Sequence, residues 1–414
     1  MDESPISPDS GRLGRDAPSP HAAHQAAGSH TGIERAAYDV GALRTAQFPI
    51  TRRYAYLDNS TFGPPPRACA EAVARCLRDL SEGAQVPVSW AAEVDRVRGQ
   101  VAHLYNCTTD DVAFMKSSAE ALGLVALGLD WQPGDEVVVY ECDFPAAVLP
   151  WLNLAHLGVR VRFVRDHGRH RFEMDDVSEL VCERTRVVCL GMVNFGNGLR
   201  APIEGIAEIC RRHGVWLLVD ATQAAGVLRI DVRRLGCHLL VAHGYKFLVS
   251  GYGTAPCYVD RELRMRLRIP EPGWKTRRNA DASMTDYEWV EFVDSAARFE
   301  PSIPDLASIV GMGASLDLLL NLGSKAIERW TLDLVTAAAD ELAERGFRVV
   351  SSPRDIERSS VLSLEHDGVQ PDRLEETLRA AGVVGAVREG RLRLSFHGYN
   401  DLTDVDRLLA ALKS

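Results

Sequence analysis

Short apolar runs alternate with longer stretches of helical pattern between Tyr56 and about residue 265. The runs that predict strands are EVVVY (136–140), VRVRFV (159–164), RVVCL (186–190), VWLLV (215–219), HLLVA (238–242) and PCYV (256–259). The helices predicted between them are 117–129, 146–157 and 202–213. Near-continuous apolar strands separated by helices are typical of an α/β fold with a mostly parallel sheet and helices on both faces. Ligands of such sheets bind outside the carboxyl ends of the strands, so functional residues are expected at that edge.

The rest of the pattern predicts a disordered leader before this region and a smaller domain after it. Residues 1–48 hold few large apolar side chains and are rich in Pro, Ser, Gly and His, which is typical of disorder. Helical patterns at 309–322 and 326–345 precede runs such as SVLSLE and RLRLSF. We therefore predict a leader (1–48), a large domain (49–305), and a helical connector with a small α+β C-terminal domain (306–414).

Composition and charge narrow the class of protein. The chain has 414 residues, 46% hydrophobic and 25% charged, as in ordinary soluble globular proteins. A formal charge of −10 with no basic cluster argues against nucleic-acid binding, and no apolar run is long enough to cross a bilayer. The nine cysteines include no C-x-x-C pair, which argues against a disulfide framework and a zinc site. The N-terminus lacks the layout of a signal peptide, so we expect a cytoplasmic protein. His21, His24 and His30 are interpreted as part of a polar leader, and no metal site is predicted.

The clearest chemistry lies in LLVDATQAAG (217–226) and LLVAHGYKFLVSGYGTA (239–255). Asp220 stands at the carboxyl end of one apolar strand and Lys246 lies just past the next, so both are expected at one edge of the sheet. A partly desolvated lysine has a lowered pKa and can form a Schiff base, and a carboxylate can keep a pyridine nitrogen protonated. The pair fits a pyridoxal phosphate site, and it fits a simple Asp–Lys ion pair equally well. Dinucleotide, P-loop and G-x-S-x-G motifs are absent.

The motifs from YLDNSTFGPPP (56–66) to RLSFHGYND (393–401) occur in the order of one known family. Over nearly everything after the leader, the chain resembles the class V aminotransferases, which also include cysteine desulfurases, kynureninases and isopenicillin N epimerase. The resemblance implies the type I fold of pyridoxal phosphate enzymes, with this cofactor and a small amino acid substrate. It also implies a homodimer with active sites at the subunit interface.

The resemblance gives roles to the residues at the strand ends. Lys246 looks like the lysine that bonds to the cofactor and moves a proton between the substrate Cα and the cofactor. Asp220 looks like the partner of the pyridine nitrogen, and Gln223 like the residue that hydrogen-bonds the phenolic oxygen. His243 stands where relatives often contact the phosphate, although a structural histidine would also fit.

The segment SSAE (117–120) is a further candidate for the phosphate site. Its S-x-x-E spacing is that of a helix capping box, and the free N–H groups at a helix start suit a phosphate. The family places its cofactor phosphate at the matching turn, which gives this role to Ser117, Ser118 and Ala119. Capping without any ligand is the alternative.

Three more residues are assigned through the resemblance. Phe144 in ECDFPAAVLPW (141–151) matches an aromatic ring that stacks on the pyridine. Asn194 in MVNFGNG lies near a position that contacts a cofactor oxygen. Arg393 in RLRLSFHGYN matches the arginine that binds the substrate α-carboxylate, for which a planar guanidinium is suited. An exposed arginine on a strand is the alternative for Arg393.

The chain departs from the family pattern at two places. Ser302 and Ile303 stand where relatives often have Gly-Thr, whose threonine reaches the phosphate across the dimer. No cysteine follows Cys257, whereas desulfurases carry a persulfide cysteine on a loop near the C-terminal arginine, so the persulfide route is disfavoured. We therefore predict a pyridoxal phosphate-dependent aminotransferase. The alternatives are an isopenicillin-epimerase-like epimerase or C–X lyase on the same fold and, in another class, a non-catalytic binding protein.

Overall fold

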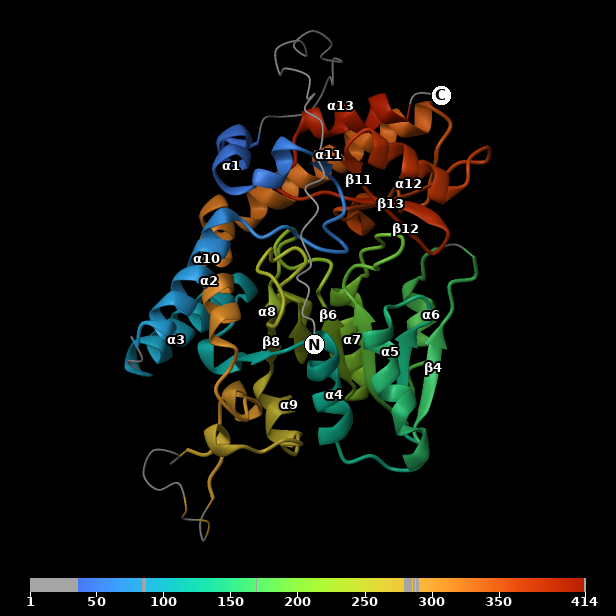
Figure 1. Cartoon of the computed structure of the whole chain (residues 1–414). Helices are drawn as coiled ribbons and strands as arrows, with labels where there is room; N and C mark the ends of the chain where they lie inside the picture. The colour runs from blue at the N-terminus through green and yellow to red at the C-terminus, as the bar shows by residue number, and fades with distance from the viewer. Residues whose placement is uncertain are drawn as a thin grey trace, which may run out of the picture. The chain divides into compact units, whose positions relative to one another are not determined.

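A seven-stranded sheet carries most of the buried strands in the computed structural model, which describes residues 36–83, 87–168, 170–278, 285, 287 and 290–412 (Figure 1). In spatial order the strands are β2 (Val112–Met115), β8 (Ala255–Val259), β7 (Leu239–Val241), β6 (Trp216–Asp220), β5 (Thr185–Gly191), β3 (Glu136–Tyr140) and β4 (Arg160–Val164). The five strands from β7 to β4 run parallel, and β8 runs antiparallel to both of its neighbours. The predicted mostly parallel sheet is confirmed.

Both faces of this sheet are covered, because its strands are apolar on both sides. In β3, Val138 and Tyr140 pack into one core cluster, whereas Val137 and Val139 pack into the other. The first cluster is closed by α3 (Pro87–Tyr105), α7 (Ile203–His213) and α10 (Leu306–Leu322), and the second by α4 (Ser118–Gly128) and α5 (Pro145–Leu152). Burial on both faces is why the strands read as continuous apolar runs.

The start of α4 follows the predicted capping signal in part. The Ser117 Oγ accepts the N–H of Glu120 at 3.1 Å, as an N-cap does. The Glu120 carboxylate, however, accepts the N–H of Lys116 rather than that of the cap residue. The capping box is therefore incomplete, because the Glu120 carboxylate binds the residue before the N-cap.

The C-terminal part of the chain forms a second, four-stranded antiparallel sheet (Figure 1). Its order is β12 (Ala386–Arg388), β13 (Arg391–Ser395), β10 (Val361–Glu365) and β9 (Arg348–Val349). The helices of this part are α11 (Ser324–Glu344), α12 (Pro371–Ala380) and α13 (Leu402–Ala411). The early strand β1 (Ala55–Tyr56) pairs with β11 (Val383–Val384), and Leu57 joins the same core cluster. The N-terminal segment thus belongs to this packing unit as well, and the boundary at 305/306 remains a prediction.

The predicted disordered leader needs a correction at its end. Residues 1–35, with His21, His24 and His30, lie outside the described residues. Within the remainder, α1 (Val40–Gln47) begins after Asp39, whose Oδ1 accepts the N–H of Ala42 at 2.9 Å. Val40 packs into the C-terminal core cluster and Phe48 stacks on Tyr399 at 4.1 Å. Disorder was therefore the wrong expectation for residues 40–48, because their apolar positions are buried against distant parts of the chain.

The remaining helices are α2 (Arg67–Ser81), α6 (Met174–Ser178), α8 (Val232–Leu235) and α9 (Arg261–Arg266). Neither α2 nor α3 nor the edge strand β2 was predicted. No single helix among the described residues is long and apolar enough to cross a membrane, and α10 with α11 meets those criteria only as a pair bent by 79°.

Candidate active site

A pocket of about 400 Å³, counted out to its solvent opening, lies where β5, β6 and β7 end. Its lining residues are Ser118, Asp143, Phe144, Ala147, Gly191, Val193, Phe195, Asp220, Thr222, Gln223, His243, Tyr245 and Lys246. Six of the predicted site residues are among them: Ser118, Phe144, Asp220, Gln223, His243 and Lys246. The carboxyl ends of neighbouring parallel strands meet at one edge, which is why residues far apart in sequence converge here.

Lys246 lines the pocket, and only 7% of it is exposed. Burial is the main reason why the pKa of Lys246 is lowered to about 8. The Asp220 carboxylate raises this pKa, whereas the guanidinium groups of Arg393 and Arg388 lower it further. Its Nζ lies 5.3 Å from the ring centroid of Phe144. Lys246 and Asp220 form no ion pair within 4.0 Å, so the simple ion-pair interpretation does not describe this site.

Asp220 is held at the end of β6 by the turn that follows it. Its Oδ1 accepts the N–H of Thr222 at 2.8 Å, and the Thr222 hydroxyl oxygen accepts the N–H of His243 at 3.0 Å. A second carboxyl group, Asp143, lines the same pocket and accepts the N–H of Gly191 at 2.8 Å. Burial raises the pKa of Asp143 to about 7, the Gly191 N–H lowers it, and the charge of Asp220 raises it further. The sequence prediction missed Asp143, although it stands directly before Phe144 in ECDFP.

The start of α4 and His243 meet at one side of the pocket. The N–H of Ser118 donates to Nε2 of His243 at 3.2 Å, so that nitrogen carries no proton. Burial lowers the pKa of His243, Asp220 raises it, and Lys246 lowers it. Ser118 lines the pocket at the helix start, whose positive dipole end suits an anion. Ser117 caps the helix and Ala119 is not in the lining, so their contact with a phosphate remains a prediction.

Aromatic rings form the open side of the pocket. Phe144 is 45% exposed, and its ring meets Phe195 edge to face, with centroids 5.3 Å apart. Exposure of a large apolar side chain is costly unless a partner covers it. A flat ring placed over the Lys246 amine would do so.

Two predicted amide contacts differ in their support. Gln223 donates from Nε2 to the Ser60 carbonyl at 3.2 Å, and its buried Oε1 has no partner among the described residues. Asn194 lies outside the lining: its Oδ1 accepts the N–H groups of Gly196 and Asn197, and its Nδ2 donates to the Cys142 carbonyl at 2.7 Å. Asn194 therefore holds its own loop in place, and its contact with a cofactor remains a prediction.

Arg393 is buried, with 2% exposed, so the alternative of an exposed strand arginine is wrong. Its Nη2 donates to Asp58 Oδ1 at 3.1 Å and to the Thr61 hydroxyl at 2.6 Å, and Nη1 donates to the Phe195 carbonyl at 2.8 Å. Its Nε–H has no partner among the described residues. Arg388 reaches the same Thr61 hydroxyl at 3.1 Å, and the sequence prediction missed it.

These residues fit the cofactor that the sequence resemblance implies. The pocket combines a buried lysine of lowered pKa, a carboxylate at the next strand end and an unsatisfied amide oxygen. It also combines a helix start and an aromatic ring. Ser302 and Ile303 are exposed and lie outside the lining, so any role for them across a subunit interface remains a prediction.

Comparison with known proteins adds a family to this geometry. A family model described as Aminotransferase class-V matches residues 56–408. A cysteine desulfurase from Synechococcus elongatus is 29% identical over 343 residues, which are 77% of this chain and 53% of that protein. The chain thus spans about half the length of this relative.

Two solved structures share the fold. The apo structure of a cysteine desulfurase from Thermococcus onnurineus NA1 matches with a TM-score of 0.81 and 22% identity, over 91% of this chain and 97% of that one. The cystine C–S lyase C-DES, in complex with its reaction product cysteine persulfide, matches with a TM-score of 0.81 and 20% identity, over 88% and 98% of the two chains.

Proposed function

Because the chain belongs to the aminotransferase class-V family, we propose that it is a carbon–sulfur lyase acting on an α-amino acid that carries sulfur on Cβ. Membership confirms the resemblance, the type I fold and pyridoxal phosphate as the cofactor. The finer prediction of aminotransfer is not confirmed. The similar proteins are named for cysteine desulfuration and cystine C–S cleavage, which favours the lyase alternative.

The hairpin between β12 and β13 is the observation that favours a lyase over a desulfurase. Glu389 and Gly390, with φ of +50° and +70°, form a two-residue turn directly after Arg388. The resemblance places the persulfide cysteine of desulfurases on a loop near the C-terminal arginine. The two-residue turn forms no such loop between β12 and β13, and no cysteine follows Cys257. With no thiol there to accept it, we infer that the sulfur leaves in a released product.

The pocket residues would hold the cofactor from several sides. When bound, the cofactor supplies an electron sink for the electron pair left at the substrate Cα. Lys246 would bond to it, Asp220 would face its ring nitrogen, and Phe144 would cover its ring. Ser118, at the start of α4, and His243, in the turn after β7, would hold its phosphate.

Arg393 and Lys246 would act on the substrate. The unpartnered Nε–H of Arg393 would be satisfied by the substrate carboxylate, which removes the cost of a buried unpaired donor. Lys246, whose pKa is about 8, is neutral in about one molecule in ten at pH 7, and in this form it would accept the Cα proton. The Cβ–S bond then breaks and its electron pair leaves with sulfur. For cystine plus water, the balanced products are pyruvate, ammonia and cysteine persulfide.

The test is product analysis of the pyridoxal phosphate-loaded protein with L-cystine, L-cysteine and L-alanine. Pyruvate and ammonia should appear in equal amounts from the sulfur substrates, and none from L-alanine, which lacks a leaving group. Formation of alanine from cysteine would instead be desulfuration. Conversion of the cofactor to pyridoxamine phosphate, with a keto acid that keeps its sulfur, would be aminotransfer. Either result would overturn the proposal.

Two variants sharpen this test. All nine cysteines are among the described residues, and Cys142 is the exposed one. Because the proposed route uses no thiol of the protein, Cys142→Ser should keep full activity. Loss of activity would show that sulfur passes through the protein. Lys246→Ala should abolish turnover, and a wild-type protein as inert as this variant would favour the binding-protein alternative.

The homodimer remains a prediction, to be checked by sedimentation.

A further inference from the structure

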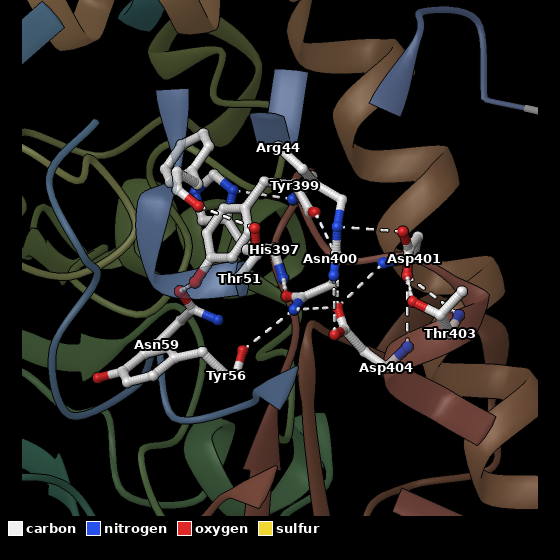
Figure 2. Close-up of polar contacts among 12 residues, drawn as sticks. Arg44, Thr51, Tyr56, Asn59, His397, Tyr399, Asn400, Asp401, Thr403 and Asp404 are labelled. Atoms are coloured by element: carbon white, nitrogen blue, oxygen red, sulfur yellow. Dashed lines mark hydrogen bonds and ion pairs between the residues drawn. The ribbon is translucent and has the colours of Figure 1, made fainter. Parts of the chain in front are cut away.

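His397 is a buried histidine that lies outside the pocket lining. It follows β13 by two residues and is 2% exposed. Figure 2 shows it within a cluster of polar side chains drawn from both ends of the chain, among them Asn59, Tyr399 and Asn400. A buried imidazole requires partners for both ring nitrogens, and those partners define what it does.

The partners of His397 determine its protonation. Its Nε2 lies 2.8 Å from the Phe247 carbonyl oxygen, which can only accept, so Nε2 carries the proton. The N–H of Gly398 donates to Nδ1 at 2.8 Å, so Nδ1 carries none. The ring is therefore neutral, with one tautomer. Burial lowers the pKa of His397 to about 4, which keeps this arrangement at neutral pH.

Phe247 is the residue directly after Lys246, and the backbone carbonyls around this lysine are all hydrogen-bonded. The Tyr245 carbonyl accepts the N–H of Gly63 at 2.8 Å, and the Lys246 carbonyl accepts the N–H of Val249 at 3.0 Å. The Phe247 carbonyl accepts the N–H of the His397 ring. Of these three bonds, only the last is made by a side chain, and that side chain comes from the segment that carries Arg393.

A second set of bonds fixes His397 itself. Its backbone N–H donates to Asn400 Oδ1 at 2.8 Å, and Asn400 Nδ2 donates to Asp404 Oδ2 at 2.9 Å and to the Tyr56 carbonyl at 3.0 Å (Figure 2). The Tyr399 hydroxyl donates to Asn59 Oδ1 at 2.7 Å. The imidazole ring also stacks between Phe247 and Tyr399, with centroids 6.0 and 5.4 Å away. These contacts hold the ring in one orientation.

We propose that His397 is a positioning residue for Lys246: its Nε2–H holds the Phe247 carbonyl and so fixes the lysine backbone relative to the segment of Arg393. The inference rests on the proposed role of Lys246 as the cofactor-binding residue. It does not depend on which amino acid is cleaved. Misplacement of a reacting group by about 1 Å can lower a rate on the order of 100-fold. Loss of the single hydrogen bond to the Phe247 carbonyl should therefore change the rate measurably.

A matched pair of substitutions separates this role from packing. In His397→Gln, the side-chain amide reaches as far as Nε2 does and keeps a donor for the Phe247 carbonyl. In His397→Asn, the amide ends near the place of Nδ1, so it accepts the Gly398 N–H but does not reach Phe247. Tyr399→Phe is the control within the same cluster, since it removes the bond to Asn59 and leaves the Phe247 bond intact.

The first readout is the rate at which the cofactor-free protein captures pyridoxal phosphate at Lys246, followed by absorbance with no substrate present. We expect His397→Asn to slow capture by about tenfold or more, and His397→Gln and Tyr399→Phe to stay within about threefold of the wild type. Thermal unfolding is measured in parallel, where Tyr399→Phe is expected to lower stability as well. Equal capture rates for His397→Asn and Tyr399→Phe would overturn the proposal.

A measurement on the wild-type protein covers the case in which His397→Asn does not fold. In ¹⁵N-histidine NMR, the His397 ring should show a single neutral Nε2–H tautomer, and its Nε2–H signal should shift when borohydride fixes the cofactor to Lys246. An unchanged signal would overturn the proposal. A wild-type protein that captures the cofactor but cleaves no C–S bond would refute the lyase and leave the role of His397 standing. One that captures no cofactor would refute the role of Lys246 and the proposal with it.

Discussion

Capture of pyridoxal phosphate by Lys246 should follow pH with a midpoint near 8 rather than near the 10.5 of an ordinary lysine. Only a neutral amine attacks a carbonyl, so the rate follows the neutral fraction. A pKa near 8 leaves about one lysine in ten neutral at pH 7, against about one in 3,000 for a pKa of 10.5. The lowered pKa should therefore raise the neutral fraction of Lys246, and with it the rate of capture, about 300-fold at pH 7.

Burial is the main cause of the lowered Lys246 pKa, and the neighbouring charges modify it. Desolvation of the Lys246 ammonium is the largest effect, and the cations Arg393 and Arg388 act in the same direction. Arg388→Gln removes one of these cations, so the Lys246 pKa should rise and capture at pH 7 should slow. Arg229→Gln is the matched control, because Arg229 is largely exposed, pairs with Glu328 and lies outside the pocket lining.

The assay is stopped-flow absorbance of the cofactor-free protein mixed with pyridoxal phosphate between pH 6 and 10. The rate should fall about tenfold for each pH unit below 8 and level off above it. The midpoint should move to higher pH in Arg388→Gln and stay in place in Arg229→Gln. A wild-type midpoint near 10.5 would refute the reasoning, since it would mean that water solvates the Lys246 amine.

Three further predictions follow from close contacts and buried charges. Gly63→Ala should impair both folding and cofactor capture, because a Cβ there would lie 1.9 Å from the Lys246 carbonyl oxygen; a variant with wild-type melting and capture would contradict this. Asp58→Asn should lower the free energy of unfolding by about 3–5 kcal/mol in urea titration, because it leaves the buried Arg393 cation without its acid, whereas a change under about 1 kcal/mol would mean that water reaches the guanidinium. The pKa of His397 is about 4 in the folded protein and 6.5 in an ordinary histidine. As the pH falls, the unfolded chain therefore binds a proton at this residue before the folded protein does. The free energy of unfolding should fall by about 3 kcal/mol between pH 6.5 and pH 4. His397→Gln should lack this part of the loss in denaturant titrations across that range, and identical pH profiles of the two proteins would contradict the assignment.

The sheet was predictable because its strands obey a local rule. Each interior strand must be apolar on both faces, so β3 reads as EVVVY and was predicted with the bounds that it has. The edge strand β2 is only four residues long and escaped this rule, although it is buried. Its burial comes from antiparallel pairing with β8, more than 130 positions later, which the local pattern does not contain.

The candidate site likewise contains residues that the local sequence pattern predicts and residues that only the tertiary structure brings together. Asp220 ends an apolar strand, and Gln223 and Lys246 lie within about one turn after such strands, so the strand pattern places them at one edge. Arg388 and Asp58 lie near each other only because β1 and β11 join the two ends of the chain in one packing unit. Residues of this kind need the tertiary structure, since their spacing in the sequence carries no period.

Strand β13 carries Arg393, which lies outside the pocket lining, and the residues after β13 carry His397. Arg393 contacts Asp58, Thr61 and the Phe195 carbonyl, and four residues later His397 contacts the Phe247 carbonyl beside Lys246. In the proposed roles, Arg393 binds the substrate carboxylate, and His397 on the same stretch of backbone positions the lysine through the Phe247 carbonyl. A displacement of this segment therefore moves carboxylate binding and proton transfer together. An apolar residue of similar size in place of His397 would fill the space but leave the Phe247 carbonyl buried without this donor.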